Sequence, residues 1–282
     1  MGSRRSVLIS GCSSGIGHCV AHGLHRQGFH VVASARKPED VARLTEEGLD
    51  AVRIDLDDPA SIGEGYRQAL ELSGGRLYGL FNNGAYGLPG AVEDLSWEAL
   101  EAQLRTNLLG WHELTRLAIP SMRQQGEGRI IHNSSVLGLV AMPYRGAYIC
   151  SKFALEGLSD TLRLELHGTG IHVSLIEPGP IRSRFRDNAF AKYRQYIDKT
   201  NSPHRANYEA MERRLKKEGD AAPFTLPPEA VLKRVLHALN SKRPRPRYAV
   251  TVPTYAFAFL RRVLSTRQLD SLLRKASGSG AR

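Results

Sequence analysis

Three side chains in this sequence could together move a proton: Ser135, Tyr148 and Lys152. Tyr148 and Lys152 are four positions apart, so on a helix they lie on one face, one turn from each other. A free tyrosine has a pKa of about 10, and an ammonium about 4 Å away could lower that pKa by up to about three units. The phenol could then act as a general acid or base near neutral pH. The same spacing also occurs by chance in many helices, so the rest of the chain must support this interpretation.

Short apolar runs alternate with helical patterns along most of the chain. The runs predict strands at residues 7–10, 30–35, 51–55, 77–82, 129–134, 171–178 and 247–252. Helical patterns lie between them, the longest at 96–125 and one that carries Tyr148 at 148–167. This alternation predicts the α/β class, as a three-layer Rossmann fold with a doubly wound, seven-stranded parallel sheet and helices on both faces.

Composition and cysteine usage narrow the class of protein. Of the 282 residues, 41% are hydrophobic and 24% are charged, which is typical of a globular chain. No apolar run has the length of a membrane span, and the run near the N-terminus reads as a strand and not as a signal peptide. Three cysteines without metal-ligand spacing favour a reducing cytoplasm. The ten histidines are not spaced with carboxylates as ligands would be, so no metal is expected.

A glycine-rich stretch, Ser10 to Gly17, follows the first predicted strand and precedes a helical pattern. Glycines there allow a tight turn and let backbone N–H groups approach a pyrophosphate, which the N-terminus of the next helix also attracts. The position within an α/β pattern therefore favours a dinucleotide site. The alternative is a glycine turn that binds nothing.

The end of the second strand indicates which dinucleotide is bound. An NAD-binding chain usually has an acidic residue there that accepts hydrogen bonds from the ribose 2'-hydroxyl. Here the sequence continues Ser34-Ala35-Arg36-Lys37. Because a guanidinium suits a 2'-phosphate, we predict NADP(H), with Arg36 as the clamp and Ser13 or Ser14 as additional donors. Alternatively, Arg36 is a solvated loop charge.

Further motifs extend this pattern. Asp55 follows the third strand, Asn82-Asn83-Gly84-Ala85 follows the fourth, Asn107 lies in the long helix, and a run from Pro178 to Ser183 follows the sixth. Together with the glycine loop, Ser135 and Tyr148-x-x-x-Lys152, this ordered set resembles the short-chain dehydrogenase/reductase family over residues 5–185. Within that family it looks most like the branch of retinol-type and 17β-hydroxysteroid-type dehydrogenases and bacterial NADP-dependent aldehyde reductases.

The resemblance implies a role for each matched residue. Tyr148 would donate a proton to a carbonyl oxygen that Ser135 also hydrogen-bonds, Lys152 would hold the nicotinamide ribose, and Asn107 would anchor a proton-relaying water. Asp55 would meet the adenine, Asn82 the adenosine side, and the segment around Ile181 and Ser183 the carboxamide. The implied cofactor contacts are Gly11, Ser13, Ser14, Gly15, Ile16, Gly17, Arg36, Asp55, Asn82, Tyr148, Lys152, Pro178, Gly179, Ile181 and Ser183. A homodimer or homotetramer is implied as well. The structural alternatives are a strand-end cap for Ser135, a structural hydrogen bond for Asn107 and a turn for Asp55.

One motif departs from the family pattern. The family usually has Asn-Asn-Ala-Gly after the fourth strand, whereas this chain has Gly84 followed by Ala85. If the last position needs a positive φ, Ala85 costs about 1 kcal/mol there. We expect an altered adenosine wall and retained binding.

Residues 183–226 form a charged insert that occupies the position of a substrate lid in the family. Its aromatic residues could join apolar residues after Ser135 to form a pocket for a hydrophobic aldehyde, ketone or alcohol. The candidates are Phe185, Phe190, Tyr193 and Tyr196 from the insert, with Leu137, Val140, Met142, Pro143 and Tyr144. Aromatic residues at helical spacing can equally serve packing alone.

The excess of positive charge belongs to the C-terminal part of the chain. The net charge is +11, and residues 233–282 contain twelve Lys or Arg against one acidic residue. We predict a catalytic domain at 1–254 and a basic amphipathic helix with a disordered end at 255–282. That helix could lie on an anionic membrane or pack on the body or on a second subunit. Specific nucleic-acid binding is not expected.

These observations favour an NADP(H)-dependent carbonyl reductase, or the reverse alcohol dehydrogenase, in the cytoplasm and possibly at a membrane surface. One alternative is a cofactor-binding redox sensor on the same fold. Such a sensor could lose the catalytic Ser, Tyr or Lys, and all three are present. Another alternative is a membrane-surface scaffold that depends on the basic tail.

Overall fold

The computed structural model describes residues 4–215, 219 and 222–277. Seven parallel strands form one sheet in the order β3-β2-β1-β4-β5-β6-β7. The strands are β1 (Ser6–Ile9), β2 (His30–Ala35), β3 (Asp50–Arg53), β4 (Gly79–Asn82), β5 (Gly128–Asn133), β6 (Ile171–Glu177) and β7 (Arg247–Ala249). The predicted fold class is therefore confirmed, with β7 shorter than the predicted strand at 247–252.

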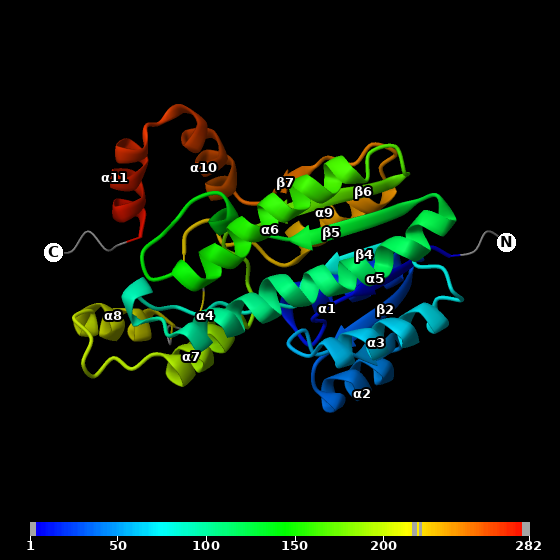
Figure 1. Cartoon of the computed structure of the whole chain (residues 1–282), viewed down its shortest axis with the longest axis horizontal. Coiled ribbons are helices and arrows are strands. Elements are labelled where there is room, and N and C mark those ends of the chain that lie inside the picture. Colours follow the sequence, from blue (N-terminus) through cyan, green and yellow to red (C-terminus); the bar gives the residue numbers. More distant parts are fainter. Residues whose placement is uncertain (1–3, 216–218, 220–221, 278–282) are drawn as a thin grey trace.

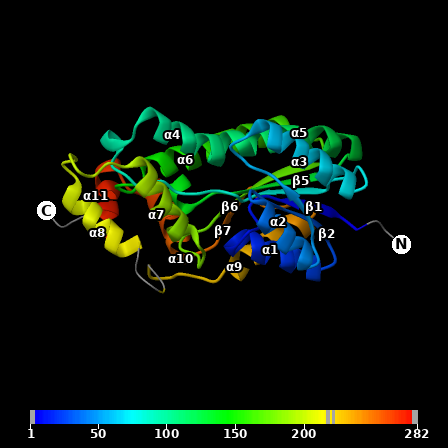
Figure 2. The ribbon, with the colours of Figure 1, turned by 90° about the horizontal axis from the view of Figure 1, so that it is seen from below.

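Helices cover both faces of the sheet, as the two views in Figures 1 and 2 show. On one face lie α1 (Gly15–Arg26), α2 (Pro38–Glu46) and α9 (Glu229–Asn240), and on the other lie α3 (Pro59–Leu72), α5 (Gly110–Gln125) and α6 (Gly146–Glu165). Each face has its own apolar core. Since the central strands are buried on both sides, β1 and β4 are mainly apolar, whereas β5 buries Arg129, His132 and Asn133 among its apolar residues.

The side on which successive strands join the sheet changes at β1: β2 and β3 lie on one side of it, and β4 to β7 lie on the other. Strand β1 pairs with β2 on one side and with β4 on the other. In open α/β sheets, such a switch point leaves a crevice at the carboxyl ends of the strands, and ligands bind there. The glycine loop, the end of β2 and the Asn82–Ala85 segment all start at this edge.

The long helix predicted at 96–125 is divided into three segments. It consists of α4 (Trp97–Leu104), the π-helical turn η2 (Arg105–Leu109) and α5. Gly110 begins α5 so close to the loop after β3 that a Cβ atom there would lie 2.2 Å from the Leu56 carbonyl oxygen. The wide turn lets the helix follow the sheet through this contact, and it carries Asn107.

The insert and the tail lie at the same end of the molecule (Figure 1). The insert contains α7 (Phe185–Tyr196) and α8 (Arg205–Leu215), and short 3₁₀ turns occur at η1 (Val92–Asp94) and η3 (Val136–Gly138). The tail forms two helices, α10 (Val252–Val263) and α11 (Thr266–Ala276), so the prediction of one helix at 255–275 is wrong. Leu264 is extended, and Ser265 starts α11 with a capping box to Gln268.

Part of the tail lies outside the described residues: the end predicted as disordered falls mostly on residues 278–282.

Among the residues described, no helix combines the length and the apolar character needed to cross a bilayer.

Candidate active site

A cavity of about 1830 Å³ occupies the carboxyl edge of the sheet, between the glycine loop, the lid helices and the tail. It brings together most of the residues that the sequence selected. The cavity is lined by Gly11, Ser13, Ser14, Gly15, Ile16, Arg36, Asp55, Ser135, Tyr148, Lys152, Pro178, Gly179, Ile181 and Ser183. Segments up to about 170 positions apart in the chain therefore meet at one site.

Two residues predicted to contact the cofactor lie behind the cavity wall. A Cβ atom at Gly17 would lie 2.2 Å from the Gly11 carbonyl oxygen, so Gly17 permits helix–loop packing. Asn82 is fully buried, and its Nδ2 donates to Thr115 Oγ1 at 3.0 Å. The neighbouring Asn83 lines the cavity instead and donates to the Gly11 carbonyl oxygen at 3.2 Å. The sequence analysis missed Asn83, although it belongs to the same motif.

Asn107 is also buried outside the cavity lining. Its Nδ2 donates to the Tyr86 carbonyl oxygen at 2.8 Å, and its Oδ1 accepts from the Tyr86 amide at 3.1 Å. The Asn107 side chain thus holds the backbone of the loop that follows β4 at Tyr86. The side-chain contacts correspond to the structural alternative, and the water-relay role stays a prediction.

The glycine loop has the features of a phosphate cradle. Gly11 and Gly15 have positive φ angles of +74° and +59°. Ser14 caps α1 without a side-chain hydrogen bond, and the first turn of α1 contains no acidic residue. The amide groups of this turn and the positive end of the helix dipole therefore favour an anion at the cavity floor.

The exchanged Gly84-Ala85 pair causes no backbone strain. Tyr144 and Phe224 are the only described non-glycine residues with positive φ, so the expected cost at Ala85 does not arise. A Cβ atom at Gly11 would lie 2.4 Å from the Gly84 Cα. The two glycine backbones are thus in close contact, and a side chain at Gly84 would have little room: its Cβ would lie 2.9 Å from a methyl carbon of Leu56.

Two cationic residues follow β2 at the cavity edge. Arg36 and Lys37 are exposed and line the cavity. A third cation was not predicted: Arg43 Nη2 donates to the Ser13 carbonyl oxygen at 2.8 Å while it also pairs with Asp40 and Glu47. Arg43 is thus paired with two carboxylates and lies outside the cavity lining.

Ser135 and Tyr148 face each other in the cavity wall. Ser135 lies two residues after the end of β5 and caps η3, where its hydroxyl oxygen accepts from the Leu137 amide at 3.1 Å. Tyr148 is in the first turn of α6, and its ring meets the edge of Phe185 at 5.5 Å between centroids. Burial raises the pKa of Tyr148 to about 12, although its contact with Ser135 opposes this rise. The predicted lowering of the Tyr148 pKa is therefore wrong for the protein alone, because desolvation dominates.

Lys152 is buried one turn further along α6. Its Nζ donates to the Asn133 carbonyl oxygen at 2.8 Å and lies 4.1 Å from the centroid of the Trp111 ring. Burial lowers the pKa of Lys152 to about 7, and Glu156 opposes this shift. The Nζ lies 5.6 Å from the centroid of the Tyr148 ring, and its separation of about 4 Å from the phenol oxygen stays a prediction.

The lowered pKa of Lys152 predicts a specific pH dependence of stability. Lys152 has its ordinary pKa of 10.5 in the unfolded chain and about 7 in the folded protein. Between these values the unfolded state binds the extra proton, so stability should rise with pH, by at most about 1.4 kcal/mol per unit. Below about pH 7 both states are protonated and the burial penalty is fully present. Urea unfolding of the cofactor-free protein, compared with Lys152→Met, should show this rise only with the lysine. Equal pH slopes in the two proteins would contradict it.

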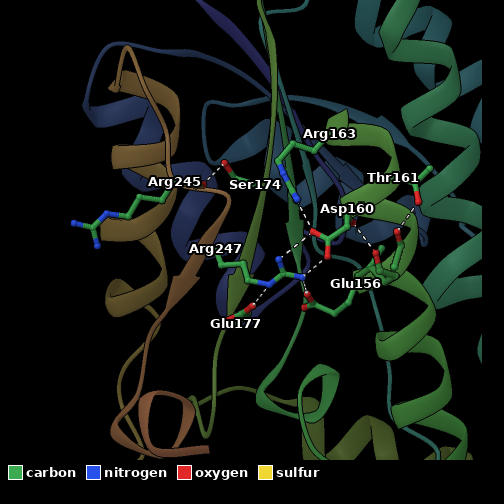
Figure 3. A network of polar contacts seen from close by, with 11 residues as sticks. Glu156, Asp160, Thr161, Arg163, Ser174, Glu177, Arg245 and Arg247 are labelled. Carbon is green, nitrogen blue, oxygen red and sulfur yellow. Dashed lines mark hydrogen bonds and ion pairs between the residues drawn. The ribbon is translucent and has the colours of Figure 1, made fainter. Parts of the chain in front are cut away.

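An ionic cluster supports α6 from behind (Figure 3). Arg247, the first residue of β7, bonds Glu156 at 2.8 Å and Asp160 at 2.9 and 3.0 Å, and its Nε lies 3.1 Å from Glu177 Oε1. Burial raises the pKa of Glu177 to about 7 and also raises the pKa of Glu156. Glu156 accepts in addition from the hydroxyl of Ser134, the neighbour of Ser135. The cluster thus connects β6 and β7 to the helix that carries Tyr148 and Lys152.

The part of the cavity beside the lid and the segment after Ser135, here called the substrate half, includes some of the predicted aromatic and apolar residues. Phe185, Tyr196, Leu137, Met142, Pro143 and Tyr144 line it. Phe190, Tyr193 and Val140 do not: the first two pack in the core beneath the lid, and Val140 packs against Leu273 of α11. For these three residues, the packing alternative holds.

The tail forms a further wall of this cavity, which the sequence analysis did not predict. Val252, Pro253, Ala256, Phe257 and Leu260 of α10 line it, as do Leu272 and Ala276 of α11. The amphipathic pattern at 255–275 indicates that one face is buried, but it carries no information on what covers that face. The alternative that the tail packs on the body is therefore confirmed.

Cationic residues line the cavity beside these apolar ones: Arg145, and Arg184, Arg186, Lys192 and Arg214 from the lid. Arg145 lies three positions before Tyr148, and burial, together with Arg214, lowers its pKa to about 10. Its Nη1 donates to the Tyr144 carbonyl oxygen at 2.9 Å.

The prediction that histidines do not cluster with carboxylates is wrong at one place. His18 and His22 of α1 each place Nε2 2.7 Å from Glu47 Oε2, just after α2. These hydrogen bonds, with Arg43, lower the pKa of Glu47 to about 2. The carboxylate is 25 positions beyond His22, so no local spacing could have indicated the group.

Comparisons with known proteins agree with this geometry. The profile of the short chain dehydrogenase family matches residues 5–194. The chain is 46% identical to the uncharacterized oxidoreductase YbbO of Escherichia coli K12, over 96% of this chain and 94% of that protein. It is 33% identical to human 17-beta-hydroxysteroid dehydrogenase type 1, over 88% of this chain and 78% of the human protein. A short chain dehydrogenase/reductase from Burkholderia phymatum in complex with NAD has a similar fold, with a TM-score of 0.75 at 23% identity, covering 96% of this chain and 95% of that one. The family predicted from the motifs is thus confirmed, and the chain is an oxidoreductase that belongs to the short-chain dehydrogenase/reductase family.

Proposed function

We propose that this protein is an NADP(H)-dependent carbonyl reductase, or the reverse alcohol dehydrogenase, for hydrophobic aldehydes, ketones or alcohols. The observation that carries the proposal is that Ser135, Tyr148 and Lys152 share one cavity with the glycine loop and Arg36. A group that could protonate an oxygen therefore lies in the same space as a site built for a dinucleotide.

The residues at the cavity floor fit such a dinucleotide. The two positive-φ glycines and the uncapped first turn of α1 suit a pyrophosphate. Arg36, Lys37 and Ser13 would hold a 2'-phosphate, with Arg43 behind Ser13. This family uses NAD or NADP, and the absence of an acid directly after β2 favours NADP.

The chain's own residues would handle the oxygen of the substrate. A reduced nicotinamide held at this site would supply a hydride to the carbonyl carbon. Tyr148, which is a neutral phenol because of its raised pKa, donates its proton to the oxygen, and the Ser135 hydroxyl donates a second hydrogen bond. Lys152, one turn away, stabilises the phenolate that remains.

The substrate class follows from the remaining walls. The tail contributes mainly apolar side chains, among them Phe257 and Leu260, and the lid adds Phe185 together with polar and cationic residues. Burial of a substrate's apolar surface there would supply about 25 cal/mol per Å². Such a wall favours an apolar chain or ring system over a sugar.

The direct test is the loss of NADPH absorbance when purified protein meets medium-chain aldehydes, retinal, steroid ketones and quinones, with NADH in parallel. Turnover of any member with NADPH supports the proposal. If NADPH binds but no carbonyl compound of the panel is reduced, the redox-sensor alternative is favoured.

The cofactor preference has its own test in Arg36→Asp. Loss of one charged contact to the 2'-phosphate, with repulsion added, should raise the NADPH dissociation constant at least about tenfold and leave NADH binding unchanged or tighter. Fluorescence titration measures both constants. Arg76→Asp, an exposed change before β4, is the matched control and should alter neither. Equal NADPH affinity in the Arg36 variant would place the clamp elsewhere.

Two further expectations remain proposals. Leu158 and Leu164 are exposed on α6, which supports the homodimer or homotetramer that the family resemblance implies. All three cysteines are unpaired, which supports the proposed cytoplasmic location.

A further inference from the structure

The outer face of α10 is apolar although it is exposed. Val252, Tyr255, Phe259 and Val263 recur at intervals of three or four residues and so share one side of the helix. Their side chains are 60%, 53%, 63% and 57% exposed. Isolated apolar residues on a surface are ordinary, but four on one helical face form a continuous strip.

This strip continues into the cavity. Val252 belongs to the exposed strip and also lines the cavity, and Ala256, the next residue around the helix, is exposed and lines it too. Pro253, Phe257 and Leu260 then extend the lining inward. Apolar surface therefore extends from the outside of α10 to the wall of the substrate half without an intervening charge on this side of the helix.

On its other side, the strip borders a basic hollow. This second cavity, of about 430 Å³, is lined by Arg234, Arg245, Arg247, Arg261 and Arg262, with Tyr255 at its rim. Arg247 is engaged by the carboxylates of the α6 cluster. Arg262 and Arg234 make uncharged contacts with the Ala258 carbonyl oxygen and the Tyr255 hydroxyl. The hollow contains one acidic residue, Glu177, so it carries a net positive charge.

We propose that α10 docks on an anionic membrane surface, with the strip in the acyl–headgroup boundary and the basic hollow on lipid phosphates. This inference rests on the proposed function, because it makes the lipid bilayer the source of hydrophobic substrates. Charge complementarity selects this occupant: α10 and α11 hold five basic residues and one acidic residue. An apolar strip flanked by arginines is the arrangement that binds such interfaces. A substrate in the bilayer then reaches the cavity along Val252 and Ala256.

Phe259→Asp tests the strip without touching the cavity lining. Vesicles of phosphatidylcholine alone are compared with vesicles that also contain phosphatidylglycerol, and bound protein is measured by flotation. The unmodified protein should bind the anionic vesicles and lose affinity as salt rises. Phe259→Asp should lower that affinity at least about tenfold. The change removes an aromatic ring that the membrane would bury and adds a negative charge that the anionic lipids repel. Leu72→Asp, at an exposed apolar position on α3, is the matched control and should bind as the unmodified protein does.

The basic hollow is tested separately. Arg262→Gln should weaken binding to anionic vesicles by about fivefold, and Arg262→Lys should restore it, because the charge and not the geometry of a carboxylate pair is needed. Equal binding by Arg262→Gln and the unmodified protein would remove the hollow from the proposal.

Turnover separates this proposal from the proposed function. Reduction of a short, water-miscible aldehyde should be equal in Phe259→Asp, Leu72→Asp and the unmodified protein, while reduction of a long-chain aldehyde held in anionic vesicles should fall only in Phe259→Asp. The docking proposal is overturned if the unmodified protein ignores anionic vesicles, or if Phe259→Asp instead changes the oligomeric mass, which would make the strip a subunit interface. If vesicles are bound but no carbonyl is reduced by any variant, the proposed function fails and the docking surface remains.

Discussion

Replacing Tyr148 by phenylalanine should lower kcat for carbonyl reduction by about 100- to 10,000-fold, the usual contribution of a positioned general acid. The ring remains to pack against Phe185, so the cavity wall should be preserved. Tyr148 is buried and lines the cavity, and Phe cannot supply the proton of its phenol. Steady-state kinetics with the best carbonyl substrate and fluorescence titration of NADPH measure the two effects.

The binding constant makes this result interpretable. NADPH affinity should change by no more than about twofold, since the lost hydroxyl is assigned to the chemical step. Tyr66→Phe is the matched control. It removes a phenol hydroxyl of α3 that contacts Ser121 of α5, and its kcat should stay unchanged. Undiminished turnover in the Tyr148 variant would refute its role as proton donor.

The second large effect is expected at Arg247. In Arg247→Met, the carboxylates of Glu156, Asp160 and Glu177 lose their shared partner, and two of the three are buried. Removing one member of a buried ionic cluster typically costs 3–5 kcal/mol, and the partial exposure of Arg247 places our expectation near the lower value, about 3 kcal/mol. Chemical denaturation measures the free energy of unfolding.

A neighbouring arginine provides the control. Arg163 is exposed to about the same degree as Arg247 but pairs, among the described residues, with Asp160 alone, so Arg163→Met should cost less than about 1 kcal/mol. The loss in Arg247→Met should also be smaller at acid pH, because protonation of the raised-pKa carboxyl groups of Glu156 and Glu177 removes their repulsion. Similar losses in the two variants would show that the cluster adds little to the stability of the fold.

Much of the fold could be predicted because its signals are local. A strand buried on both faces, such as β1, is mainly apolar along its length, and a phosphate-binding loop needs glycines where φ is positive, as at Gly11 and Gly15. The spacing of the proposed catalytic residues is equally local, since Tyr148 and Lys152 share one helix. Such features depend on residues within one or two turns of each other, so the sequence displays them directly.

The parts that could not be predicted depend on contacts between distant segments. In the motif after the fourth strand, the cofactor contact is predicted at Asn82, whereas Asn83 lines the cavity. The sequence does not indicate which of the two adjacent amide side chains faces Thr115 in the interior. The pKa of Tyr148 was misjudged because the charge of Lys152 follows from spacing, whereas the desolvation of both groups follows from the complete wall around them. The break at Leu264 is an exception, because its capping box joins Ser265 to Gln268 and is local. The continuous amphipathic pattern hides it.

The two-helix tail has a consequence for how this enzyme could diversify. Ser135, Tyr148, Lys152 and the glycine loop are all held within residues 5–194, whereas the tail contributes wall surface through α10 and α11. Mutations at Phe257, Leu260 or Leu272 would therefore change which molecules fit without disturbing the atoms that react. Selection could then reshape substrate range through a short terminal segment while the chemistry is inherited unchanged.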